Sequence, residues 1–203
     1  MIFALAAVAF AADDPLMQGC DLTDGKFVEI YNEAVANIGS DLKRARTQAD
    51  RALKMQPQCA GAALMAIQSR LLLADPSMFL FMGDAERLHP NLSLFPEYRS
   101  HGLFLAQDFA GALQAAQLAR PVDPESIQAA TFEFNALMRL GKYDEVETLI
   151  STYPGADAAS RDCLRIRMYI DQKKPAGSLR SSCAASSDTA IRELALGDLD
   201  LVG

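Results

Sequence analysis

The sequence has no tryptophan and few aromatic residues, which make up 7% of its 203 residues although half of the residues are hydrophobic. So few large rings favour helices that pack closely on alanine and leucine over a large globular core. Histidine is equally scarce: His89 and His101 are the only two, and neither lies at metal-ligand spacing from the other or from a cysteine. We therefore predict neither a metal site nor a cofactor.

Basic residues are fewer than acidic ones, 19 against 26, and the formal net charge is -7. A negatively charged protein repels phosphate groups, so nucleic acid and anionic membrane surfaces are disfavoured as partners. The basic residues cluster in two places, and we interpret both clusters as solvated helix faces. The clusters are residues 43–46, and Arg161, Arg165, Arg167, Lys173 and Lys174.

The sequence also lacks a recognisable catalytic constellation. Ser40 and Lys43 have the serine-x-x-lysine spacing of penicillin-recognising enzymes, but the partner motifs of those enzymes are missing. No glycine-rich phosphate-binding loop with its lysine is present either. We predict that the protein is not an enzyme.

Residues 1–12 form an uncharged apolar run that is too short to span a bilayer. The run and the small residues Ala9 and Ala11 are typical of a signal peptide, whose cleavage would leave residues 13–25 as an N-terminal segment. No basic residue precedes the run, so we expect a signal peptide that is truncated at its start. Two alternatives stay open, a short membrane anchor and lipidation at Cys20. We predict a periplasmic or otherwise exported bacterial envelope protein, which meets a membrane only indirectly or through an uncleaved N-terminal segment.

Export would place the four cysteines in an oxidising compartment, where an even number favours disulfides. Of the three possible pairings, Cys20 with Cys59 and Cys163 with Cys183 keeps each bridge within neighbouring elements. Each bridge would contribute roughly 3 to 4 kcal/mol by restricting the unfolded chain. The alternative is that some of the four are free buried thiols.

Three prolines, Pro57, Pro90 and Pro124, stand 33 and 34 residues apart, and each follows a helical stretch that contains alanines. Apolar residues recur at intervals of three and four, and no strand-like alternation extends through six residues. This spacing is that of a repeated pair of helices, so we predict an all-α chain.

If the three prolines occupy position 32 of a unit of about 34 residues, small side chains stand where the two helices of a hairpin touch. They are Ala66 and Ser100 at position 8, and Ala45, Ala52, Ala85, Ala112 and Ala119 at positions 20 and 27, with Met78 as an exception. This pattern resembles the tetratricopeptide repeat family. The resemblance implies a right-handed α-solenoid of about four to five helix hairpins, with units at 26–58, 59–92, 93–126 and 127–156.

The fourth unit carries the resemblance in residues 140–146, which are similar to the turn and second-helix start of the family. Pro154 comes early, so we expect a short second helix there. A degenerate C-terminal helical pair or cap would follow at 157–203. Asp75-Pro76 and Asp123-Pro124 predict helices that begin at the proline, and Gly141 predicts a helix end.

In the family, first helices line a concave groove that binds proteins or peptides. Carried over to this chain, the groove positions are Phe27, Ile30, Asn37, Arg70, Glu97, His101, Asn135 and Arg139. Arg70, Asn135 and Arg139 would hold a peptide carboxylate. We predict an adaptor that binds a partner protein or peptide and supports assembly of an envelope complex. The alternative is an enzyme or enzyme regulator that uses the repeats for substrate recognition. The oligomeric state stays open.

Overall fold

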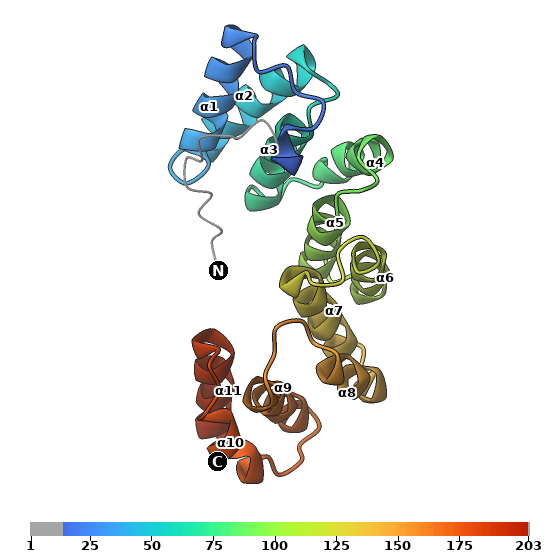
Figure 1. The fold of residues 1–203 in the computed structure, drawn as a ribbon, viewed down its shortest axis with the longest axis vertical. Helices are drawn as coiled ribbons and strands as arrows, with labels where there is room; N and C mark the ends of the chain where they lie inside the picture. Colours follow the sequence, from blue (N-terminus) through green and yellow to red (C-terminus); the bar gives the residue numbers. More distant parts are fainter. Residues whose placement is uncertain (1–13, 203) are drawn as a thin grey trace. The chain divides into compact units, whose positions relative to one another are not determined.

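The computed structural model describes residues 14–202, with side chains described for residues 14–200; the signal peptide expected at 1–12 lies outside the described residues. Within that part the chain forms eleven α-helices and two short 3-10 helices, and no strand (Figure 1). The all-α prediction is therefore confirmed. No helix among the described residues combines the length and the apolar character that crossing a bilayer requires.

The α-helices follow one another with short connections, and each of the four expected units contains two of them. They are α1 (Gly25–Asn37), α2 (Leu42–Met55), α3 (Ala60–Leu72), α4 (Met78–Leu88), α5 (Leu94–Leu105), α6 (Phe109–Ala119), α7 (Ile127–Arg139) and α8 (Tyr143–Ser151). The C-terminal segment holds α9 (Ala158–Asp171), the 3-10 helix η2 (Gly177–Leu179), α10 (Arg180–Cys183) and α11 (Thr189–Val202). With nine residues, α8 is shorter than α2, α4 and α6, as the early Pro154 predicts.

Helix starts follow from short side chains that accept backbone hydrogen bonds. The carboxylate of Asp41 accepts from the Arg44 amide at 3.0 Å, and so caps α2. The two Asp-Pro predictions placed the helix starts too early: Asp75 accepts from the Ser77 amide within a turn, and α4 begins at Met78. In the same way Ser126, not Asp123, caps α7. A proline after aspartate fits a turn as well as a helix start, which explains the shift.

The chain divides into two compact units, residues 1–102 and 103–203. In the first, α1 to α4 lie side by side (Figure 1). The helix α3 is buried from Ala60 to Leu71, and its apolar faces contact α2, α4 and the 3-10 helix η1 (Pro15–Met17). The disulfide between Cys20 and Cys59 ties η1 to the start of α3, with the two Cα atoms 4.4 Å apart.

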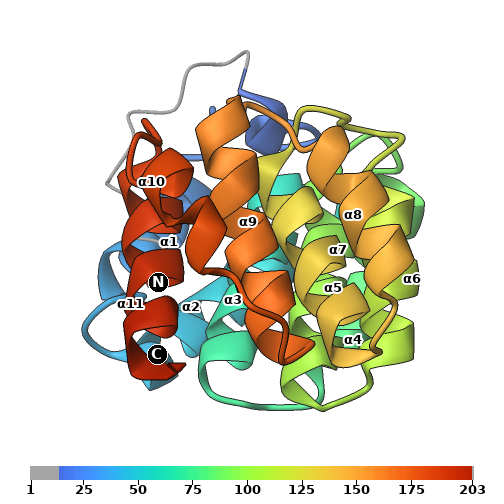
Figure 2. The same ribbon diagram turned by 90° about the horizontal axis from the view of Figure 1, so that it is seen from below.

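In the second unit, α6 to α9 contact one another in order, and α11 packs along α9 (Figure 2). One cluster of apolar side chains joins α6, α7, α8 and α9 around Phe134, Leu137 and Val146. A smaller cluster around Ile166 joins α9, α10 and α11. Within it lies the second disulfide, Cys163 to Cys183, with the Cα atoms 4.7 Å apart. Both predicted pairings are confirmed, and no cysteine among the described residues is free.

Candidate ligand-binding groove

Phe27 and Ile30, expected to line a groove, lie in the core of the N-terminal unit. Their exposed fractions are 1% and 5%, and both pack in one cluster with Met17 and the buried alanines of α2. This corrects the expectation of an exposed role: a helix turns its apolar stripe to its neighbours, and in α1 that stripe includes the two carried-over positions.

Arg70 is also part of the folded core, with 3% of its surface exposed. Its guanidinium pairs with Asp50 at 2.7 Å, donates to the Ala66 carbonyl at 2.9 Å and lies over the Phe81 ring at 4.0 Å from its centre. These contacts join α2, α3 and α4. Arg70 therefore holds the unit together, which corrects its assignment to a peptide clamp.

The other expected groove residues of this unit have local partners or are buried. Asn37 donates to the Glu33 carbonyl at 2.7 Å within α1. Glu97 is buried. His101 is half-buried on α5, and burial lowers its pKa.

Asn135 and Arg139 lie one turn apart on α7 of the C-terminal unit, and the structure brings both to one cavity of about 560 Å³. The apolar side chains of the cavity are Phe104, Phe134, Met138 and Ile170, and its other polar side chains are Arg167, Asp171 and Asp198. The cavity thus has an apolar floor with amide, guanidinium and carboxylate groups around it, which is the usual composition of a site for a peptide or a small molecule.

The charged side chains of this cavity differ in the contacts that they make with other side chains. Arg167 on α9 lies 3.6 Å from a carboxylate oxygen of Asp198 on α11. The Tyr143 hydroxyl donates to Asp171 at 2.7 Å, and this hydrogen bond raises the pKa of Tyr143. Arg139 is exposed and lies 4.5 Å from the centre of the Phe109 ring. A guanidinium that rests on a ring keeps its donors available to a ligand.

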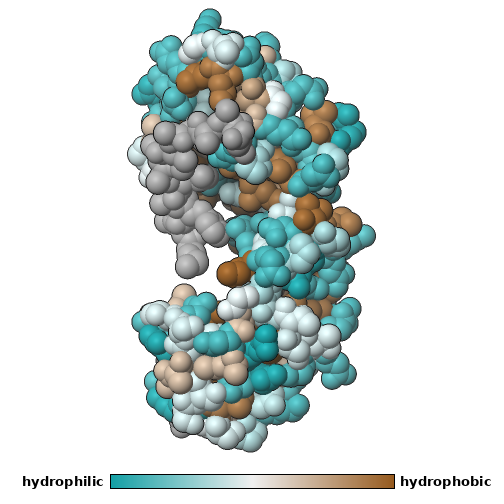
Figure 3. Space-filling view, in the orientation of Figure 1, coloured by the Kyte–Doolittle hydropathy of each residue, from teal (hydrophilic) through white to brown (hydrophobic). Residues whose placement is uncertain are grey.

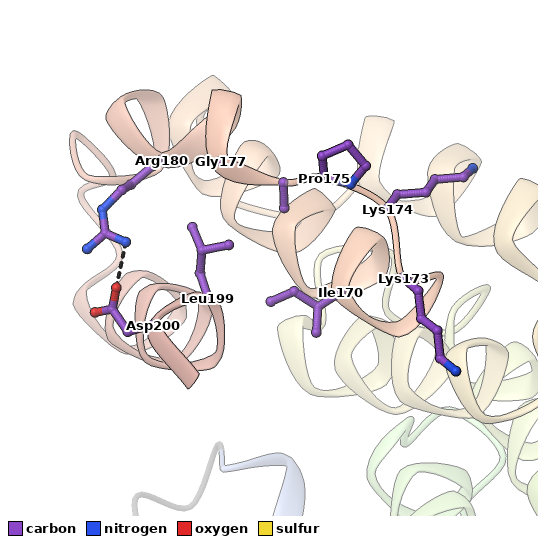
Figure 4. Close-up of a pocket in the computed structure, with 9 residues that line it drawn as sticks. Ile170, Lys173, Lys174, Pro175, Gly177, Arg180, Leu199 and Asp200 are labelled. Atoms are coloured by element: carbon purple, nitrogen blue, oxygen red, sulfur yellow. Dashed lines mark hydrogen bonds and ion pairs between the residues drawn. The ribbon is translucent and has the colours of Figure 1, made fainter. Parts of the chain in front are cut away.

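A second cavity, of about 770 Å³, borders the C-terminal end of α9, the loop after it and the last turns of α11 (Figure 4). Ile170 and Leu199 face one another across it, and Arg180 pairs with Asp200 at 2.6 Å on one side. Lys173 and Lys174 extend outward from the opposite rim (Figure 4). Ile170 lines both cavities, so we treat them as one surface and call it the α9 groove.

Of the residues that line the α9 groove, sequence reasoning named Asn135 and Arg139 as binding candidates, whereas it placed Arg167, Lys173 and Lys174 on a solvated face. The available signal was the clustering of these basic residues in the sequence, on α9 and in the loop directly after it.

Exposed leucines outside the groove do not form a second candidate. Leu80, Leu105 and Leu118 are more than half exposed but lie on different helices. On the face drawn in Figure 3, hydrophobic residues form separate spots among hydrophilic ones. Single apolar side chains of this kind are normal on a protein surface.

The described residues contain no group of three histidine, cysteine or acidic side chains that could hold a metal ion. The α9 groove offers charged side chains, hydrogen-bonding groups and apolar side chains, all of which can contact a ligand. Comparison of the chain with protein-family models gives no match, and no curated protein matches it.

Proposed function

We propose that this protein is an exported, non-catalytic scaffold of tetratricopeptide-type hairpins that holds a segment of a partner protein in the α9 groove. The observation that carries the proposal is the groove itself. Two successive first helices, α7 and α9, supply an apolar floor together with Asn135, Arg139 and Arg167. Such a surface binds a chain segment without any covalent chemistry.

Packing of the helix pairs supports the repeat interpretation. The small residues at the expected contact positions are buried: Ala45, Ala52, Ala66, Ala85, Ser100, Ala112 and Ala119. Pro57, Pro90 and Pro124 stand in the connections after α2, α4 and α6. These are the places that a hairpin repeat assigns to them.

The paired cysteines support export. Cysteines remain as thiols in most reducing compartments, whereas disulfides persist in the periplasm and outside the cell. Both disulfides of this chain are therefore bonds that an oxidising compartment would preserve. On this basis we place the scaffold in the bacterial envelope, where it would support the assembly of a complex.

The test is capture at the groove followed by measurement of affinity. A photo-crosslinking amino acid replaces Asn135 in one variant and Ser151, on the exposed surface of α8, in the control. The protein captured at position 135 alone is identified, purified and titrated against wild type, Arg139→Ala and Arg51→Ala. Arg51 is exposed on α2 and donates a hydrogen bond to the Gln48 side chain, three residues earlier in the same helix, at 2.9 Å.

We expect Arg139→Ala to raise the dissociation constant about fivefold, which corresponds to about 1 kcal/mol, and Arg51→Ala to leave it unchanged. Equal affinities for the two variants and wild type would reject the groove as the binding site. Capture that is equally strong from positions 135 and 151 would reject it as well.

A further inference from the structure

The α9 groove is basic in a chain that is acidic as a whole. Five basic side chains stand around it against three acidic ones: Arg139, Arg167, Lys173, Lys174 and Arg180 against Asp171, Asp198 and Asp200. The whole chain has 19 basic and 26 acidic residues. A local excess of one charge sign against the overall balance is a feature that steers and selects a partner of the opposite sign.

Three of the five cations are free to meet a ligand. Arg167 and Arg180 already pair with Asp198 and Asp200 of α11. Within the part of the chain that the structure describes, no acidic group lies at ion-pair distance from the other three, which are Arg139, Lys173 and Lys174.

The helix α11 shows which chemistry fits the surface of α9. Its apolar side chains Leu196 and Leu199 pack in the cluster around Ile166 of α9. The aspartates at 198 and 200 pair with arginines of α9 and α10 at the same time. The chain thus already packs one acidic segment with leucines, α11, beside the α9 groove.

We infer that the partner segment bound by the α9 groove is an acidic amphipathic segment. Its apolar side chains enter the two cavities that meet at Ile170, and its carboxylates lie against Arg139, Lys173 and Lys174. This inference rests on the proposed function, because it names the chemistry of the segment that the groove holds. A basic segment would leave the three cations opposed by like charges, at a cost to affinity.

The test uses three fluorescent peptides with leucines at the same positions and with glutamate, glutamine or lysine at the others. Each is titrated by fluorescence anisotropy against the wild-type mature chain and two charge-reversal variants. The first variant is K173E/K174E, at the rim of the groove. The control is K43E/K54E, in which two exposed lysines of α2 are reversed, so that the net charge changes equally.

We expect the glutamate peptide to bind about tenfold more tightly than the lysine peptide, since several exposed charge pairs of under 1 kcal/mol each act together. Its affinity should fall about tenfold in K173E/K174E. In K43E/K54E the change should stay within about twofold, and raising the salt to about 0.5 M should weaken wild-type binding.

Equal binding of the three peptides would overturn the acidic preference, as would binding of none of them. Equal losses of affinity in the two charge-reversal variants would overturn it too, because the net charge of the protein alone would then explain the effect. These outcomes are separate from those of the capture experiment, which alone decides whether the groove holds a partner.

Discussion

Replacing Arg70 by alanine should destabilise the N-terminal unit by about 3 kcal/mol. The guanidinium lies where α2, α3 and α4 meet, and only 4% of its side-chain surface is exposed. The substitution removes the hydrogen bond to the Ala66 carbonyl, the pair with Asp50 and the contact with the Phe81 ring. It also leaves a space between the helices.

The magnitude follows from these losses and from the exposure of Asp50. A hydrogen bond from a charged donor contributes about 1.5 to 3 kcal/mol, and a partly buried ring contact about 1 kcal/mol. Breaking a fully buried ion pair costs about 3 to 5 kcal/mol. However, the Asp50 side chain is 40% exposed, so water can hydrate the carboxylate once Arg70 is gone. The total therefore falls at the lower end of that range.

Urea unfolding followed by circular dichroism, with both disulfides intact, measures the loss. Arg87→Ala is the matched control: its ion pair with Asp84 joins side chains that are 69% and 75% exposed. Such a pair contributes less than about 0.5 kcal/mol, so the control should unfold at nearly the wild-type urea concentration. If Arg70→Ala and Arg87→Ala unfold at the same midpoint, the structural role assigned to Arg70 is refuted.

Three further predictions concern the described residues. Burial lowers the pKa of His89, so the folded state disfavours its charged form. The free energy of unfolding should therefore fall as the pH drops below about 6.5. His89→Leu should flatten that pH dependence, which urea titrations at pH 7.5 and 5.5 measure. Replacing Cys163 and Cys183 by alanine should cost about 3 kcal/mol and speed proteolysis of the loop after α9; unchanged cleavage would contradict this. Gly61→Ala should cost about 1 to 3 kcal/mol, whereas Gly39→Ala, with open space around it, should not destabilise; melting curves compare them.

Helix content, the helix end at Gly141 and the cysteine pairing could be predicted from the sequence because they depend on local signals. Gly141 follows Leu140, the C-cap residue of α7, and adopts a left-handed conformation with φ of 67°, which is typical of a helix end. Cys20 and Cys59 could be paired because loop length and neighbouring elements restrict the choice. The Asp-Pro starts could not be placed, since Ser126 stands three residues after Asp123 and caps α7, and Ser77 takes the N-cap position of α4 without a capping hydrogen bond from its side chain.

Only part of the candidate site could be predicted. A residue position carried over from the repeat family does not show which other residues of this chain pack over it. The 3-10 helix η1 lies on α3, where a Cβ atom at Gly61 would come within 2.9 Å of the Leu16 carbonyl. That close approach, fixed by the Cys20 to Cys59 disulfide, depends on residues that precede the first expected repeat. No pattern inside the repeat could have indicated it.

Arg70 in the first unit and Arg139 in the second show the same limit of prediction from the sequence. Both are arginines near the end of a helix, and the family resemblance led us to expect both in the groove. What separates them is the helix that precedes each of them in the chain. Asp50 stands within reach of Arg70, so the guanidinium folds inward and pairs. Arg139 has the Phe109 ring beside it instead, and a ring supports a guanidinium without neutralising it. Among the described residues no acidic group pairs with Arg139, and this is why the binding experiments are directed at the α9 groove.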